Sequence, residues 1–231
     1  SEGSLANIRR AVEDLSLELV IGTTAAMNEI FADSLDRFSN VCNGCFKTVY
    51  TLGMNLAHAR GLKHVVTGLS RGQIFETRLA DLFRIGITDR DAVDRAIIEA
   101  RRAYHQVDDA VRRNLDTKLF DDAALFDEIQ IVDFYRYRDV GLDELYEFLG
   151  TRAPWVRPAD TGRSTNCLIN NTGIYVHTKE REFHNYALPY SWDVRLGHKT
   201  KEEALAELED EIDLVQVRDI LDQVGYELKV A

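Results

Sequence analysis

The sequence predicts an α/β protein, with a parallel sheet flanked by helices and a mostly helical C-terminal part. Three apolar segments have the length and the β-branched content of buried strands: residues 17–23, 63–67 and 128–135. Before and between them, apolar residues recur at the three- and four-residue spacings of helices. Because alternating helices and strands are typical of a parallel sheet covered by helices, we expect these strands to form one small parallel sheet.

The first elements of the chain follow this alternation. An apolar residue at every third or fourth position of 4–15 predicts a helix with one buried face, made of Leu5, Ile8, Val12 and Leu15. The stretch "LELVIGTT", at 17–24, is apolar and rich in β-branched residues, and it predicts a buried strand that ends in small polar residues. The next stretch, "AMNEIFADSLDRF" at 26–38, returns to helical spacing.

The middle of the chain repeats the pattern. After a loop at 42–45, we expect a helix from about residue 46 to 60, because Gly61 is the residue type that most often follows a helix end. The stretch "KHVVTG" predicts a short strand that runs into a turn-rich loop. Apolar residues at spacings of three and four then predict a long helical region over 91–115.

The last third of the chain differs in composition and in hydrophobic periodicity. The predicted strand at 128–135 is followed by a short helix, "LDELYEFL", and then by residues 154–199, which hold all the prolines and tryptophans and show little helical periodicity. A capping box at Thr200–Glu203 opens two C-terminal helices. We therefore predict a single domain, with an α/β part at 1–153 and a site-lining irregular segment with C-terminal helices at 154–231.

Composition excludes several classes of protein. Among 231 residues, 45% are apolar and 29% are charged, as in ordinary globular proteins, and no apolar run reaches the length of a membrane helix. The net charge of −11 argues against a broad nucleic-acid surface, so we expect a small-molecule or carrier-bound substrate and consider tRNA less favoured. We expect a cytoplasmic protein without a signal peptide, since three cysteines fit a reducing cytoplasm better than a disulfide framework. A homodimer is compatible with this composition.

Three thiols form the first candidate site. The stretch "VCNGCFKTVY" holds Cys42 and Cys45, and "STNCLIN" holds Cys167. A redox pair usually has its first cysteine at a helix start just after a strand, whereas a helix precedes this loop. Structural zinc takes four ligands, so His177 or His184 would have to complete the set. Three cysteines can hold a [4Fe–4S] cluster with one open iron, and a site without metal is the remaining alternative.

Two strand ends form the second candidate site. Ligands of parallel sheets bind beyond the carboxyl ends of the strands, here at Thr23 and at Thr67 and Gly68. The loop that follows, "LSRGQ", adds Arg71 and Gln73. Small residues let backbone amides approach a phosphate, and an arginine binds it in a bidentate manner. A plain turn would have the same composition.

A third candidate region is polar and aromatic. The stretch "DTGRSTNCLINNTGIYVH" holds Arg163 and Asn166, and "FHNYALPYSWDVRLGHK" holds His184 and Arg195. These four residues are candidates for binding a planar or anionic substrate. The alternatives are a loop that satisfies its own hydrogen bonds and a structural histidine.

Residues 4–80 resemble a known family. The run "CNGCFKTVYTLGMNLAHARGLKHVVTGLSRGQIFET" is similar to the N-type ATP pyrophosphatases, the adenine nucleotide alpha-hydrolase (PP-loop) superfamily. The branches that it resembles are the tRNA 2-thiolation enzymes and the N-acetyl sugar amidotransferases. Between 81 and 199 the resemblance consists of one residue, Cys167, which matches the third cysteine of the [4Fe–4S] site of the thiolation branch.

The resemblance implies an activity and cofactors. Family members use ATP with Mg²⁺ to adenylate a carbonyl oxygen, and sulfide or ammonia then displaces AMP. The resemblance implies a nucleotide at Thr67, Gly68 and Arg71, and Cys42, Cys45 and Cys167 as catalytic ligands of a [4Fe–4S] cluster, with zinc as the second choice.

The chain departs from the family in two respects. The signature loop Ser-Gly-Gly-x-Asp-Ser is not in this sequence, so we expect the phosphate-binding half to belong to a longer protein. "LSRGQ" stands where thiolation enzymes carry an acidic pair, which leaves room for another substrate. The alternative to an ATP-dependent sulfurtransferase or amidotransferase is a non-catalytic module, a degenerate half-domain that docks on a partner carrying the phosphate loop.

Overall fold

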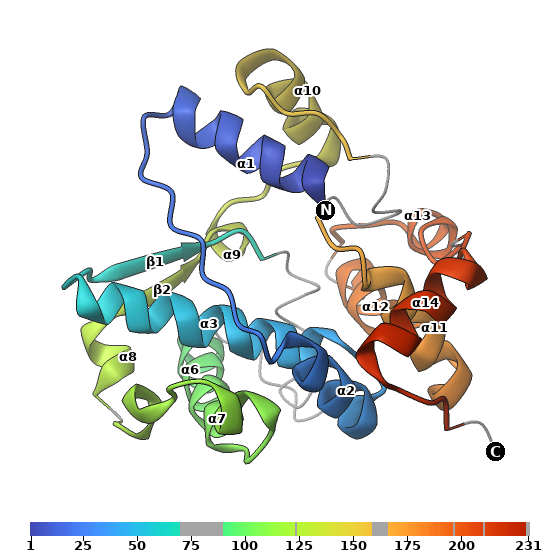
Figure 1. Cartoon of the computed structure of the whole chain (residues 1–231). Helices are drawn as coiled ribbons and strands as arrows, with labels where there is room; N and C mark the ends of the chain where they lie inside the picture. The colour runs from blue at the N-terminus through green and yellow to red at the C-terminus, as the bar shows by residue number, and fades with distance from the viewer. Residues whose placement is uncertain (70–89, 123, 159–165, 196, 210, 230–231) are drawn as a thin grey trace.

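The computed structural model describes residues 1–69, 90–122, 124–158, 166–195, 197–209 and 211–229. Their elements, in chain order, are α1 (Glu2–Asp14), α2 (Met27–Phe38), α3 (Cys42–Ala59), β1 (His64–Thr67), α6 (Arg90–Gln106), α7 (Ala110–Asn114), the 3₁₀ helix η2 (Lys118–Asp121), α8 (Leu125–Glu128), β2 (Gln130–Asp133), α9 (Phe134–Tyr137), α10 (Leu142–Arg152), α11 (Asn170–Arg181), α12 (Ala187–Arg195), α13 (Lys201–Ala206) and α14 (Leu214–Val224) (Figure 1). None of these helices is both long enough and apolar enough to cross a membrane.

The sheet is much smaller than the sequence predicted. Strands β1 and β2 pair in parallel, from His64 opposite Gln130 to Thr67 opposite Asp133. Helices take up 63% of the described residues and strands only 4%. The predicted fold class, a parallel sheet flanked by helices, is therefore wrong, and the protein is mostly helical with one two-stranded parallel sheet.

The predicted strand at 17–23 lies along helix α3 instead of in the sheet. Glu18 accepts hydrogen bonds from Arg60, just beyond the end of α3, at 2.7 and 2.8 Å. A Cβ atom placed on Gly22 would lie 3.3 Å from the Leu52 side chain of α3. A β-branched run becomes a strand only when another strand pairs with its backbone, and within the described residues none does so here.

Helix α3 crosses the middle of the molecule and contacts α2, α7 and β1 (Figure 1). Its first half packs against α2, and its second half places Met54 and Ala57 in a core with Phe120 and Phe126. The fully buried Lys47 donates from Nζ to Asp109 at 2.7 Å and to the Val107 carbonyl at 2.9 Å, which joins α3 to the start of α7. A buried ammonium needs such partners because desolvation disfavours its charge.

The C-terminal helices pack on α2 around one apolar cluster. Its members come from α2, the segments before α3 and α11, and helices α11 and α14: Leu35, Val41, Ile169, Val176, Val217, Leu221 and Val224. Residues 154–199 were predicted to be irregular, but they contain α11 and α12. Helix α11 is buried on several sides, at Thr172, Gly173, Ile174 and Val176, so it has no single apolar stripe for periodicity to detect.

Local helix signals were confirmed where they depend on neighbouring residues alone. The Thr200 hydroxyl accepts from the Glu203 amide, and the Glu203 carboxylate accepts from the Thr200 amide, which completes the predicted capping box. Gly61 follows the end of α3 with φ of +64°, a left-handed conformation that glycine adopts without steric cost.

Gly44 sets the distance between α2 and α3. A Cβ atom at this position would lie 2.8 Å from Ile30 Cγ2 and 2.9 Å from the Ile30 carbonyl oxygen. We predict that Gly44→Ala destabilises the protein by about 1–3 kcal/mol, because the added methyl group overpacks this contact. Denaturant unfolding followed by circular dichroism measures the change.

Gly53 on the same helix is the matched control. A Cβ atom at Gly53 would meet nothing within 4 Å. Gly53→Ala should raise the free energy of unfolding by up to about 1 kcal/mol, since alanine has the higher helix propensity. Equal effects of the two substitutions would contradict the close approach of α2 to α3.

Candidate functional site: three thiols at two helix starts

Cys42 and Cys45 lie in the first turn of α3, not in a loop before it. The helix begins at Cys42 because side chains accept hydrogen bonds from its first amides. Asn40 Oδ1 accepts from the Cys42 amide at 2.6 Å, and Ser34 Oγ accepts from the Gly44 amide at 3.0 Å. From the sequence we predicted that this helix begins at about residue 46, which is four residues too late.

Cys167 lies at the start of a second helix. It precedes α11, and its sulfur accepts hydrogen bonds from the backbone amides of Ile169 and Asn170. The thiol therefore accepts from amides at the start of this helix, whose N-cap residue, Ile169, makes no side-chain cap hydrogen bond. Amides at this end of a helix favour negative charge on the atom that they contact.

The two helix starts meet through a close contact. A Cβ atom on Gly173 of α11 would lie 2.9 Å from Cγ2 of Val41, the residue before Cys42. Cys42 and Cys167 both pack against the apolar cluster that contains Val41. Cys167 is also near enough to Cys45 for the charges of the two sulfurs to interact. The fold thus brings together thiols that are far apart in the sequence.

Burial keeps these thiols in their neutral form. Burial, with a smaller contribution from the negative charge of a Cys167 thiolate, raises the pKa of Cys45 to about 11. Burial also raises the pKa of Cys167, although the amides of Ile169 and Asn170 oppose this effect. At neutral pH both sulfurs are therefore protonated, and a thiolate forms when a bound cation or substrate compensates its charge.

The three thiols have the donor type and donor number of a three-cysteine cluster, but as they stand in this structure they are not arranged to hold a metal ion. Among the residues that the structure describes, no group of three or more His, Cys, Asp or Glu side chains stands in an arrangement that could hold a metal ion. Both histidines considered as a fourth zinc ligand use Nδ1 in a hydrogen bond with the backbone. His177 Nδ1 lies 2.9 Å from the Phe183 carbonyl, and His184 Nδ1 accepts from the Tyr186 amide at 3.0 Å.

Several buried polar atoms surround the start of α11. Tyr186 donates to Asn170 Oδ1 at 2.9 Å, which ties the segment of His184 to this helix start. Within the described ranges, Asn170 Nδ2, Thr172 Oγ1 and Asn185 Oδ1 are buried without a hydrogen-bond partner. Buried polar groups usually have partners, so these atoms are free to bind a substrate or water. The hydrophobic periodicity of the sequence did not indicate that these three residues would be buried.

The four predicted substrate residues are dispersed. His184 is half-buried near the start of α11, and Asn166 is exposed just before Cys167. Arg195 is the exposed last residue of α12. Arg163 lies outside the described residues.

The predicted nucleotide residues do not form one site within the described chain. Thr23 is exposed on the segment along α3, Gly68 is exposed beyond β1, and Arg71 and Gln73 lie outside the described residues. Thr67 ends β1 and donates from its hydroxyl to Asp133 Oδ1 at 2.7 Å.

A buried ion pair at the strand ends was missed in the sequence. Arg101 Nη2 of α6 donates to Asp133 Oδ2 at 2.6 Å and to the Tyr50 hydroxyl of α3 at 3.1 Å. Both charged side chains are 4% exposed. Asp133 at the carboxyl end of a predicted strand was an available signal, whereas Arg101 resembled an ordinary residue of a charged helix.

Comparison of the chain with protein-family models, with curated proteins and with solved structures finds no match. The chemistry of the site therefore has to be argued from its own residues.

The raised pKa of Cys45 predicts a pH-dependent stability. Because the folded state holds the proton more tightly than the unfolded thiol, whose pKa is 9.0, this contribution is complete below pH 9 and is lost as the pH rises towards 11. We predict that the wild type loses up to about 2–3 kcal/mol more than Cys45→Ala over this window. Unfolding free energies at several pH values measure the difference.

The exposed Val49 on α3 provides the control, since Val49→Ala should keep the wild-type pH dependence. Parallel curves for the wild type and Cys45→Ala would show that Cys45 keeps an ordinary pKa.

Loss of Asp133 should be costly because Arg101 would remain buried without its anion. We predict that Asp133→Ala lowers the free energy of unfolding by about 3–5 kcal/mol. Glu18→Ala breaks an exposed arginine pair, and it should cause no measurable change. Similar losses for both variants, in denaturant titrations, would refute a special role of the buried pair.

Proposed function

We propose that this chain carries the thiol centre of an enzyme that activates a carbonyl with ATP and transfers sulfur or nitrogen to it. The observation that supports the proposal is the meeting of Cys45 with Cys167 at the N-terminal ends of α3 and α11. The resemblance of residues 4–80 to N-type ATP pyrophosphatases supplies the reaction class. That this chain belongs to the N-type ATP pyrophosphatases is itself part of what we propose.

The two helix ends suit anionic sulfur. Unpaired amides and the helix dipole stabilise negative charge at a helix N-terminus, whether it belongs to a thiolate, a persulfide or the ligands of a cluster. The amides of Ile169 and Asn170 already point at Cys167, and their bonds strengthen when the thiol loses its proton. Apolar surroundings exclude water, so such a sulfur would be protected from side reactions.

The reaction would proceed in two steps. Attack of the substrate oxygen on the α-phosphorus of ATP releases pyrophosphate and leaves an adenylated carbonyl. Sulfide or ammonia then adds to the carbonyl carbon, and AMP leaves with the oxygen. A [4Fe–4S] cluster on Cys42, Cys45 and Cys167 would supply an open iron for sulfide.

The substrate would bind beside the thiols. Asn170, Thr172 and Asn185 offer uncharged donors and acceptors, and Asn166 and His184 belong to the same region. The net charge of −11 favours a small molecule or a carrier-bound acyl group over tRNA. Thr67 and Gly68 are the described candidates for contact with the nucleotide.

A second candidate is a non-catalytic interaction module, and one observation favours it. The segment along α3 exposes Leu17, Val20 and Ile21 at 59%, 45% and 54%, and β1 exposes Val66 at 68%. Exposed apolar side chains are typical of interaction surfaces, and the two-stranded sheet could pair with a further strand.

Anaerobic reconstitution tests the thiol centre. With ferrous iron and sulfide, we expect the wild type to acquire the broad visible absorption of an iron–sulfur cluster, and Cys45→Ala and Cys167→Ala to lose it. Val49→Ala should acquire the same absorption as the wild type, since Val49 is an exposed residue of α3. Equal absorption in all four proteins would refute a shared site for Cys45 and Cys167.

Binding of ATP with Mg²⁺, measured by equilibrium dialysis, separates the two candidates. Binding above background, with AMP formed when a small-molecule extract supplies the acceptor, supports the enzyme. If the correctly folded full-length protein binds no ATP, the enzyme proposal fails and the interaction module is favoured.

A further inference from the structure

Helix α1 is attached to the rest of the protein by its polar side. Its buried residues are Ser4 and Asn7. Asn7 Nδ2 donates to the Val156 carbonyl at 2.6 Å, and Asn7 Oδ1 accepts from the Val156 amide at 2.9 Å. A Cβ atom on Gly3 would lie 3.4 Å from Pro158. The helix, near the top of Figure 1, is therefore held by the segment that follows α10.

The apolar side of α1 faces solvent. Leu5, Ile8, Val12 and the C-cap residue Leu15 follow one another at spacings of three, four and three residues, so they form one stripe along the helix. Leu5 is 42% exposed, Ile8 45% and Leu15 63%. A surface helix normally packs such a stripe against the core, because burial of apolar surface stabilises the folded state. The exposed stripe is therefore the kind of surface that marks a protein interface.

The spacing of the stripe is that of the seam between two helices. Apolar residues that alternate at three and four positions occupy the a and d sites of a heptad, through which paired helices interlock their side chains. Leu5 and Val12 take the a sites, and Ile8 and Leu15 take the d sites. We therefore expect a second helix with the same spacing to cover this face.

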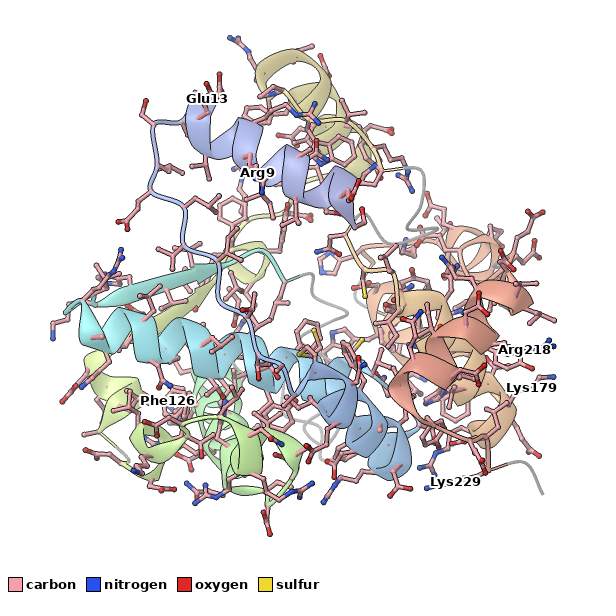
Figure 2. The ribbon with its side chains drawn as sticks, viewed as in Figure 1. Arg9, Glu13, Phe126, Lys179, Arg218 and Lys229 are labelled. Atoms are coloured by element: carbon pink, nitrogen blue, oxygen red, sulfur yellow. The ribbon has the colours of Figure 1, made fainter. Side chains whose placement is uncertain are left out.

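Two exposed charges lie beside the stripe. Arg9 and Glu13 are about one helical turn apart, and both are labelled on α1 in Figure 2. At about 3.6 residues per turn, they lie on the side of the stripe away from Ser4 and Asn7. Among the described residues neither of them forms an ion pair, so both charges are available to a partner.

These features are self-complementary in an antiparallel pair of α1 helices. When the two helices run in opposite directions, the two ends of the stripe lie level with each other, and so do its two central residues. The same register brings Arg9 close to Glu13 of the second copy, and a twofold axis repeats this pair. In a parallel pair each residue lies level with its own copy, so the two Arg9 side chains would lie level and repel each other.

The charge of α1 argues against a membrane or a nucleic acid as the occupant of this face. Helices that lie on membranes are rich in Lys and Arg. Helix α1 has two basic residues, Arg9 and Arg10, and three acidic ones, Glu2, Glu13 and Asp14. Such a helix gains nothing from an anionic surface, whereas pairing with its own copy requires only that opposite charges meet.

We propose that two copies of this chain associate through an antiparallel pair of α1 helices. The apolar stripe of each copy covers that of the other, and Arg9 of each copy pairs with Glu13 of the other. Because four apolar residues from each copy make a small interface, the dimer is weak and reversible, as interfaces below about 1,200 Å² are. No residue of the thiol centre lies on α1, so the test is independent of the proposed enzyme activity.

Sedimentation velocity of the full chain over a range of concentrations tests the proposal. At physiological ionic strength, which screens the net charge of −11, we expect a reversible monomer–dimer equilibrium. Ile8→Asp places a charge in the middle of the stripe and should weaken the dimer at least tenfold. Val215→Asp is the matched control, because Val215 is 67% exposed on α14, and it should leave the equilibrium unchanged.

Charge reversal tests the identity of the partner and the direction of the pair. Arg9→Glu and Glu13→Arg each place like charges opposite each other in the antiparallel pair, so either variant alone should dimerise several-fold more weakly than the wild type. In an equimolar mixture of the two variants, opposite charges meet again at both positions, and the mixture should associate as the wild type does. Circular dichroism verifies that each variant keeps its helix content.

Three outcomes would overturn the proposal. They are a wild type that stays monomeric at millimolar concentration, a dimer that Ile8→Asp leaves intact, and a mixture of the charge variants that associates no better than each variant alone. The first would assign the stripe to a helix of another protein. The second would place the dimer contact elsewhere on the molecule, and the third would exclude the antiparallel pair.

Discussion

The close contact of α11 with the start of α3 is the constraint on which the thiol centre depends. Gly173 allows Val41 to come within a distance that any side chain would prevent, and Gly44 does the same for α2 on α3. These two glycines let three helices converge. Since Cys42 follows Val41 and Cys167 precedes α11, their convergence also brings the cysteines together. The packing of these three helices therefore also determines where the cysteines lie relative to one another.

The two polar centres of the protein differ in how their charges are balanced. At the strand ends, Asp133, Arg101, Thr67 and Tyr50 form a paired network, which holds β2 to α3 and α6. Among the described residues, we find no ion pair at the thiol centre. The sulfurs of Cys45 and Cys167 are neutral because burial raises their pKa values, and the amides at α11 favour a charge that has not yet formed. The first network suits a structural role, and the second suits chemistry.

The failed fold-class prediction has a physical cause in residues 17–24. Their composition is that of a strand, but strand formation requires a partner, and the segment lies along α3 instead, where Glu18 pairs with Arg60. The three-stranded sheet was predicted only from the alternation of helical and strand-like segments along the sequence. Helix α11 shows the opposite error, because burial on several sides removed the periodicity by which a helix is recognised.

The sequence by itself determined the features that depend on near neighbours: the helices α2, α6 and α14, the capping box at Thr200, and Gly61 after α3. Helix α1 also forms, but its predicted buried face is wrong, since Leu5, Ile8 and Leu15 are exposed and the buried residues are Ser4 and Asn7. The sequence also marked the three cysteines as candidates. Only the tertiary structure decided that α3 starts at Cys42, that Cys167 meets Cys45, and that Arg101 pairs with Asp133. Helical spacing and caps act over a few residues, whereas these contacts join segments that become neighbours only when the chain is packed.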